Sequence, residues 1–242
     1  MTRLRKLRDR VREELSDIRW RRRFMPPEYA RPWRMAISDW LVFYYRDVLS
    51  ADSHWMGVRS LKNPLDAWVY QEIVYETRPD VILELGSAYG GSALFFAHLL
   101  DLLGGEGRVV SVDHSHEAFQ AEHRRISTVT GDTRDPAVID RVRELCAGGR
   151  AMVIHDASHD ADVVLEDLRS YSPLVAPGCY LIVEDGVGDL ISPAKGGRTS
   201  PGPFAAVGHF LGESHEFELD ARRERHIATY SPHGFLRRRT SS

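Results

Sequence analysis

Acidic side chains follow two short apolar segments, and their spacing suggests a shared site. Asp156 comes directly after the run 151–155, and Glu184 and Asp185 come directly after the run 180–183. Asp156 and Glu184 lie 28 positions apart, which fits one helix between two parallel strands whose ends meet at the same sheet edge. Three such carboxylates repel one another unless a cation neutralises them, and oxygen ligands favour Mg²⁺ over zinc. We therefore expect Asp156, Glu184 and Asp185 to bind Mg²⁺, with Ca²⁺ or Mn²⁺ as alternatives.

His159 is the candidate general base. It follows Asp156 by three positions, and a neutral imidazole can accept a proton near pH 7. The alternative is a histidine that bonds to backbone at the start of a helix capped by Asp156 or Ser158. The predicted metal site beside it favours the catalytic interpretation.

A glycine-containing turn at 86–91 follows a third apolar run and precedes a predicted helix. Glycines there allow a tight turn, and the free backbone amides of the helix start can face a ligand. Asp113 and Asp132 end the next two predicted strands, where a carboxylate can meet ribose hydroxyls or an adenine amino group; capping of the following helices is the alternative. The expected cofactor-binding residues are Glu84, Gly86, Ser87, Tyr89, Gly90, Asp113, Asp132 and Asp156.

The residues of this turn favour S-adenosylmethionine over a dinucleotide. A dinucleotide turn requires Gly-x-Gly-x-x-Gly, but Ala88 stands where its second glycine would be. Glu84 would repel a pyrophosphate, whereas a carboxylate suits the ammonium and sulfonium of S-adenosylmethionine. A methyltransferase is therefore expected, and a nicotinamide-dependent oxidoreductase is the alternative.

The elements that must position these residues alternate between strand and helix, which predicts an α/β fold. Short apolar strands of this kind are typical of a parallel sheet covered on both faces, here a Rossmann-like sheet whose last strand is antiparallel. We expect strands at 81–85, 108–113, 125–130, 151–155, 180–183, 216–219 and 226–230, helices at 38–48, 64–77, 92–103, 117–123, 136–146, 160–171 and 204–211, loops at 49–63 and 186–203, and a solvated tail at 237–239. The second loop is expected to close over a substrate.

Composition places the chain among ordinary globular proteins. It has 242 residues, a formal net charge of −3, 43% hydrophobic and 28% charged residues, which argues against disorder or a coiled coil. No apolar run approaches the roughly 20 residues of a membrane span, and a cytoplasmic protein is expected. Two cysteines, Cys146 and Cys179, are too few for a disulfide framework and are expected to be buried.

Charge is concentrated at the N-terminus, where residues 1–35 hold 12 Lys and Arg against 5 Asp and Glu. We expect a basic helical arm at 1–37 and a second domain at 38–242. The local charge of +7 suggests nucleic acid or membrane contact. An amphipathic stripe with interleaved acids favours self-association instead; its apolar members are Leu4, Leu7, Val11, Leu15 and Ile18.

Over about residues 38–238 the chain resembles the cephalosporin hydroxylase/rhamnosyl O-methyltransferase family. The similar segments are 55–57, 62–64, 70–72, 81–91, Asp156-x-x-His159, 171–178, 182–185, 202–203, 210–211 and 232–236. The resemblance implies a class I methyltransferase sheet, S-adenosylmethionine and Mg²⁺. It also implies Asp156, Glu184 and Asp185 as metal ligands and His159 as base.

The same resemblance implies an acceptor hydroxyl on a sugar or another part of a natural product, as in antibiotic biosynthesis, and a homo-oligomer. A cofactor-binding partner of a hydroxylase or methoxylation system is a further alternative. No nucleic acid or membrane partner is expected. Six aromatic residues could line an apolar acceptor cleft, although such residues are more often core or interface: Trp20, Trp33, Trp40, Tyr44, Tyr45 and Trp55.

Overall fold

The computed structural model describes residues 3–24 and 35–240, and its internal contacts divide the chain into two units, Met1–Ala36 and Ile37–Ser242. In the first unit, helix α1 spans Arg3–Phe24, which matches the helix expected there. In the described part of the chain, no helix combines the length and apolar character that a membrane span requires.

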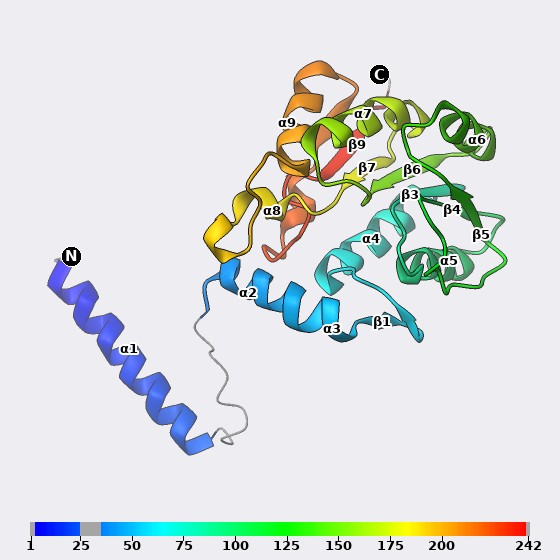
Figure 1. Ribbon diagram of the computed structural model, residues 1–242. Helices are drawn as coiled ribbons and strands as arrows, with labels where there is room; N and C mark the ends of the chain where they lie inside the picture. The colour runs from blue at the N-terminus through cyan, green and yellow to red at the C-terminus, as the bar shows by residue number, and fades with distance from the viewer. Residues whose placement is uncertain (1–2, 25–34, 241–242) are drawn as a thin grey trace. The chain divides into compact units, whose positions relative to one another are not determined.

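A seven-stranded sheet forms the centre of the second unit, within the described residues (Figure 1). The strand order is β5-β4-β3-β6-β7-β9-β8, and β9 alone runs antiparallel to its neighbours while the other pairs are parallel. This confirms the predicted mostly parallel sheet with an antiparallel last strand. The strands are β3 Val81–Leu85, β4 Arg108–Asp113, β5 Ile126–Thr130, β6 Ala151–His155, β7 Tyr180–Val183, β8 Phe217–Leu219 and β9 Phe235–Arg238.

Helices cover both faces of this sheet (Figure 1): α4 and α5 on one face, α6, α7 and α9 on the other. Every residue of the central strands β3 and β6 is buried, which explains their largely apolar sequences. The helices are α2 Ile37–Tyr44, α3 Ser50–Asp52, α4 Pro64–Thr77, α5 Gly91–Leu103, α6 Pro136–Cys146, α7 Ala161–Tyr171, α8 Val187–Leu190 and α9 Pro203–Glu213; short helical turns cover Tyr45–Leu49, Ser172–Leu174, Pro193–Lys195 and Ala221–Glu224.

Local sequence signals start the helices that follow the strands. Asn63 and Asp135 each accept a hydrogen bond from the backbone N–H two residues on, and a proline follows each of them at the first helical position. Asp160 accepts from two N–H groups at the start of α7. Both cysteines are free and buried, as expected.

Five predicted segments differ from the structure. Residues 117–123 form a short turn and an irregular stretch instead of a helix, and residues 226–230 form no strand. The last strand is β9, so Arg237 and Arg238 of the predicted solvated tail belong to the sheet. The predicted loop at 49–63 contains the hairpin of β1 His54–Trp55 and β2 Val58–Arg59, and the predicted loop at 186–203 contains α8.

Candidate active site

A cavity of about 510 Å³ opens at the carboxyl ends of the parallel strands. Its walls come from the ends of β3, β4, β5, β6 and β7 and from the segment before α4, the edge where open α/β sheets bind ligands. Predicted site residues that line it are Gly86, Ser87, Tyr89, Asp113, Asp132, Asp156, His159, Glu184 and Asp185. Glu84 and Gly90 are not among the lining residues.

The turn between β3 and α5 is shaped by close backbone packing. Gly86 has φ +84°, and a Cβ at this position would lie 2.1 Å from the backbone oxygen of Asp156. Only glycine therefore allows the ends of β3 and β6 to approach this closely. The Asp156 N–H donates to the Leu85 carbonyl at 2.7 Å, which fixes Asp156 beside the turn.

Asp113 holds the same turn from the neighbouring strand β4. Its Oδ2 accepts hydrogen bonds from the backbone N–H groups of Ser87 and Ala88, at 3.0 and 2.9 Å. Burial alone would raise the pKa of Asp113, but these backbone donors and that of Ser115 outweigh it and lower the pKa. Asp113 therefore stays ionised at the cavity wall.

Asp132 lines the cavity at the end of β5, and its carboxylate is engaged by a neighbour. Arg134 donates to it from its backbone N–H at 2.9 Å and from its guanidinium at 3.0 and 3.2 Å. These bonds lower the pKa of Asp132.

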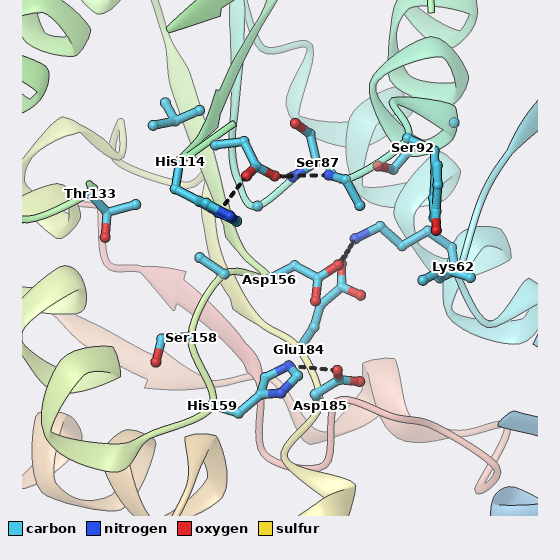
Figure 2. Close-up of a pocket in the computed structure, with 18 of the residues that line it drawn as sticks. Lys62, Ser87, Ser92, His114, Thr133, Asp156, Ser158, His159, Glu184 and Asp185 are labelled. Carbon is cyan, nitrogen blue, oxygen red and sulfur yellow. Dashed lines mark hydrogen bonds and ion pairs between the residues drawn. The ribbon is translucent and has the colours of Figure 1, made fainter. Parts of the chain in front are cut away.

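Lys62 occupies the centre of the acidic cluster, a position that sequence reasoning missed. Its Nζ lies 2.6 Å from Glu184 Oε1 and 2.7 Å from Asp156 Oδ2 (Figure 2). Glu84 Oε1 lies 3.5 Å from the same nitrogen. Burial works against the ammonium, yet the three carboxylates raise the pKa of Lys62 well above its ordinary value. The sequence feature that could have indicated Lys62 is its position directly before Asn63-Pro64, where helix α4 begins.

His159 and Asp185 face each other on the other side of this cluster (Figure 2). His159 Nε2 lies 2.9 Å from Asp185 Oδ2, and this bond raises the pKa of His159. Burial would raise the pKa of Asp185, but the bond to His159 lowers it. Asp156, His159 and Asp185 each offer a ligand atom within 4.8 Å of the others, a spacing suited to a metal ion.

The strand ends explain why these groups converge. The Glu184 N–H donates to the His155 carbonyl at 2.9 Å, so the ends of β6 and β7 stay in register. Asp185 follows with φ +59°, a left-handed turn that reverses the chain after Glu184. His155 is not among the cavity-lining residues; its Nε2 lies 2.9 Å from Asp167 Oδ2 on α7, with both side chains buried.

The segment after β7 is bonded to the His159 side of the cavity. Arg198 donates through Nη1 to the His159 carbonyl at 3.4 Å, and its Nε lies 3.4 Å from Asp189 Oδ1. Asp189 in turn accepts from the backbone N–H groups of Gly202 and Ala205 at the start of α9. The segment predicted to close over a substrate is therefore anchored beside His159.

Known proteins resemble the chain over most of its length. The Rhamnosyl O-methyltransferase/CmcI family model matches residues 47–239. The rhamnosyl O-methyltransferase of Mycobacterium tuberculosis (strain ATCC 25618 / H37Rv) is 32% identical over 217 residues, which cover 86% of this chain and 87% of that protein. That of Mycobacterium leprae (strain TN) is 33% identical over 86% of this chain and 93% of its own.

The fold also matches a solved structure, "cmcI-D160 Mg-SAM", with a TM-score of 0.62 and 23% identity over 87% of this chain and 88% of that one. This likeness is one of fold, and it agrees with the predicted Rossmann-like, mostly parallel sheet. The family match confirms the resemblance read from the sequence: the chain belongs to the rhamnosyl O-methyltransferase/CmcI family.

Proposed function

We propose that this chain transfers a methyl group from S-adenosylmethionine to a hydroxyl of a sugar, or of another part of a small natural product, with Mg²⁺ as second cofactor. The enzyme class, an S-adenosylmethionine-dependent O-methyltransferase, follows from the family, and it argues against the nicotinamide-dependent alternative. The observation that carries the proposal is the convergence of Asp156, His159 and Asp185 in one cavity with the glycine turn.

Several features of the turn fit a nucleoside-type cofactor. The Ser87 Oγ is buried at the cavity wall and has no hydrogen-bond partner among the described residues, so it is available to a ligand. The ionised Asp113 suits ribose hydroxyls, and Asp132 suits the adenine edge. Tyr89 lines the same wall, with its ring beneath the Arg59 guanidinium at 4.4 Å. Glu84 and Gly90 support this wall from outside the cavity.

The donor set also fits a divalent cation. Asp156 and Asp185 offer carboxylate oxygens, the donors that Mg²⁺ or Mn²⁺ prefers, and His159 lies beside them as the base. Lys62 binds Glu184, the third predicted ligand, and also one oxygen of Asp156. The assignment of Asp156, Glu184 and Asp185 as ligands therefore stays a prediction. It requires Glu184 to bind the metal in place of the Lys62 ammonium.

The chain's own residues supply the proton chemistry. When His159 Nε2 carries the proton shared with Asp185, its Nδ1 holds the lone pair and can accept the proton of the acceptor hydroxyl. Bound S-adenosylmethionine supplies an electrophilic methyl, and a bound cation lowers the pKa of the hydroxyl. Arg198 keeps the segment after β7 beside His159, which excludes water from the acceptor.

Mass spectrometry of S-adenosylhomocysteine formation over a panel of glycosylated natural products, with Mg²⁺ or a chelator, tests the proposal. Asp156→Ala should lose Mg²⁺-dependent turnover while calorimetry still detects S-adenosylmethionine binding. His159→Ala should turn over roughly 10²–10⁴-fold more slowly, as expected on losing a general base.

Asp140→Ala, at an exposed acid of α6, is the control. Full turnover of Asp156→Ala in chelator would overturn the metal role, and near-normal turnover of His159→Ala would overturn the base.

A further inference from the structure

A π-helical turn at Tyr45–Leu49 interrupts the helical segment between α2 and α3. The Ser50 N–H donates to the Tyr45 carbonyl, five residues back, so the turn contains one more residue than an α-helical turn. Such turns are rare in proteins and are frequent at functional sites. The extra residue changes which side chains of this helix face the cavity, and it is Tyr45 that begins the turn.

Among the aromatic candidates whose side chains the structure describes, Tyr45 is the one that lines the cavity. Tyr44 and Trp40 stack on each other at 4.8 Å and pack against a separate small core. Trp55 packs edge-on against Phe95 and donates to His98. The side chains of Trp20 and Trp33 lie outside the described residues. Tyr45 is 44% exposed, which leaves ring surface available to a ligand.

A rigid partner supports the Tyr45 ring. Tyr230 also lines the cavity and meets Tyr45 in an edge-to-face contact, with ring centroids 6.0 Å apart and planes at 87°. Tyr230 donates through its hydroxyl to the Leu41 carbonyl at 2.9 Å and through its backbone N–H to Asp66 at 2.8 Å. These bonds fix the position of Tyr230. Its ring therefore supports the Tyr45 ring through the edge-to-face contact, while part of the Tyr45 side chain stays exposed.

Tyr45 lies at the catalytic end of the cavity, away from the predicted nucleoside positions. Burial raises the pKa of its phenol, and the nearby charges of Asp185 and Asp156 raise it further. Tyr45 lines the cavity together with Asp156, His159 and Asp185.

We propose that Tyr45 is the platform on which the ring of the acceptor stacks, and that the acceptor is an uncharged hydroxylated ring with one apolar face, such as a pyranose. This inference rests on the proposed function and adds a specificity residue to it. An aromatic face carries partial negative charge and attracts the ring C–H groups of a sugar, while the hydroxyls at the ring edge reach Asp185 and His159. An anionic acceptor would be repelled by Asp156 and Asp185.

Saturation-transfer NMR with methyl α-L-rhamnopyranoside as the probe tests this inference, in the presence of S-adenosylhomocysteine and Mg²⁺. Wild type and Tyr45→Phe should saturate the ring C–H protons and bind with similar affinity, because both keep the aromatic face. Tyr45→Leu should bind the probe roughly three- to tenfold more weakly, which is the change in affinity expected when one aromatic contact is lost. Tyr75→Leu is the matched control, because Tyr75 is also exposed but lies on α4 outside the cavity lining.

The measurement distinguishes this inference from the proposed function. Affinity of Tyr45→Leu equal to that of Tyr45→Phe, or no probe binding by wild type, would overturn the stacking platform. Unchanged S-adenosylhomocysteine affinity and melting temperature in Tyr45→Leu are expected, and a loss of either would instead make Tyr45 a structural residue. Probe binding that depends on Tyr45 without any methyl transfer would support the platform and contradict the proposed function.

Discussion

The Lys62 ammonium lies within 3.5 Å of carboxylate oxygens of Glu84, Asp156 and Glu184. Glu84 and Glu184 are buried, and burial raises the pKa of each. Like charges this close in the interior require a cation among them. The sequence indicated the carboxylates but not this cation, because Lys62 is 94 positions from Asp156 and 122 from Glu184. Pairing over such distances depends on the tertiary fold.

Replacing Lys62 by methionine should destabilise the protein and make it depend on metal. Loss of one partner of a buried ion pair costs about 3–5 kcal/mol, or a fall in Tm of roughly 10 °C for a domain of this size. Added Mg²⁺ should raise the Tm of Lys62→Met more than that of wild type, because it restores positive charge among the carboxylates. Thermal unfolding with Mg²⁺ or a chelator measures both effects.

Lys195→Met is the control for this substitution, because Lys195 forms an exposed ion pair with Asp39. Exposed pairs contribute at most about 1 kcal/mol, so its Tm should stay close to that of wild type at either metal concentration. A Lys62→Met variant with the wild-type Tm would show that the carboxylates tolerate burial by taking up protons, and that Lys62 does not balance them.

Whole elements were predictable where burial dictates the sequence pattern. The apolar runs of β6 and β7 are buried on both faces, and the acids that follow these parallel strands reach the same sheet edge. Residues 226–230 have the apolar pattern of a strand, but Ala228 and Tyr230 pack instead on a second small core with Leu41 and Leu49, and Ile227 is exposed. An apolar pattern indicates burial, but it does not say which surface covers the segment.

The start of α4 is joined to this 228–230 segment through Asp66. Its Oδ2 accepts from Asn63 Nδ2 at 3.2 Å and from the Tyr230 N–H at 2.8 Å. Burial raises the pKa of Asp66 to about 6, against an ordinary value near 4. The folded state therefore holds this proton at pH values where the unfolded chain has released it.

Stability should consequently fall as pH rises through the pKa of Asp66. Its contribution is fully present below about pH 4 and is lost by about pH 6.5, a change of about 3 kcal/mol for a pKa difference of two. Asp66→Asn keeps an acceptor oxygen and removes the titration, so its unfolding free energy should change less over this range. Urea unfolding at several pH values measures the difference, with Asp140→Asn on the exposed face of α6 as control. Parallel pH profiles for wild type and Asp66→Asn would contradict the assignment.

At the scale of the whole molecule, charge separates the two units. Residues 1–35 carry a net charge of +7 in a chain whose total is −3. Helix α1 exposes apolar side chains at helical spacing, since Val11, Leu15 and Ile18 are each about half exposed. The side chains of Leu4 and Leu7, the other members of the predicted stripe, lie outside the described residues. A nucleic acid partner would use the arm's charge, whereas self-association would use its apolar face.

We expect the apolar face of α1 to mediate self-association, so light scattering should give a mass above that of a monomer for the full chain. Leu15→Glu places a charge in the middle of this face and should shift the mass toward the monomer. Glu13→Arg, on the opposite face by helical spacing, should leave it unchanged. S-adenosylmethionine binding should survive both substitutions, because the lining of the cavity lies within residues 45–230. A monomeric wild type would contradict the prediction. Association with DNA that weakens steeply with salt would assign the arm to phosphate contacts instead.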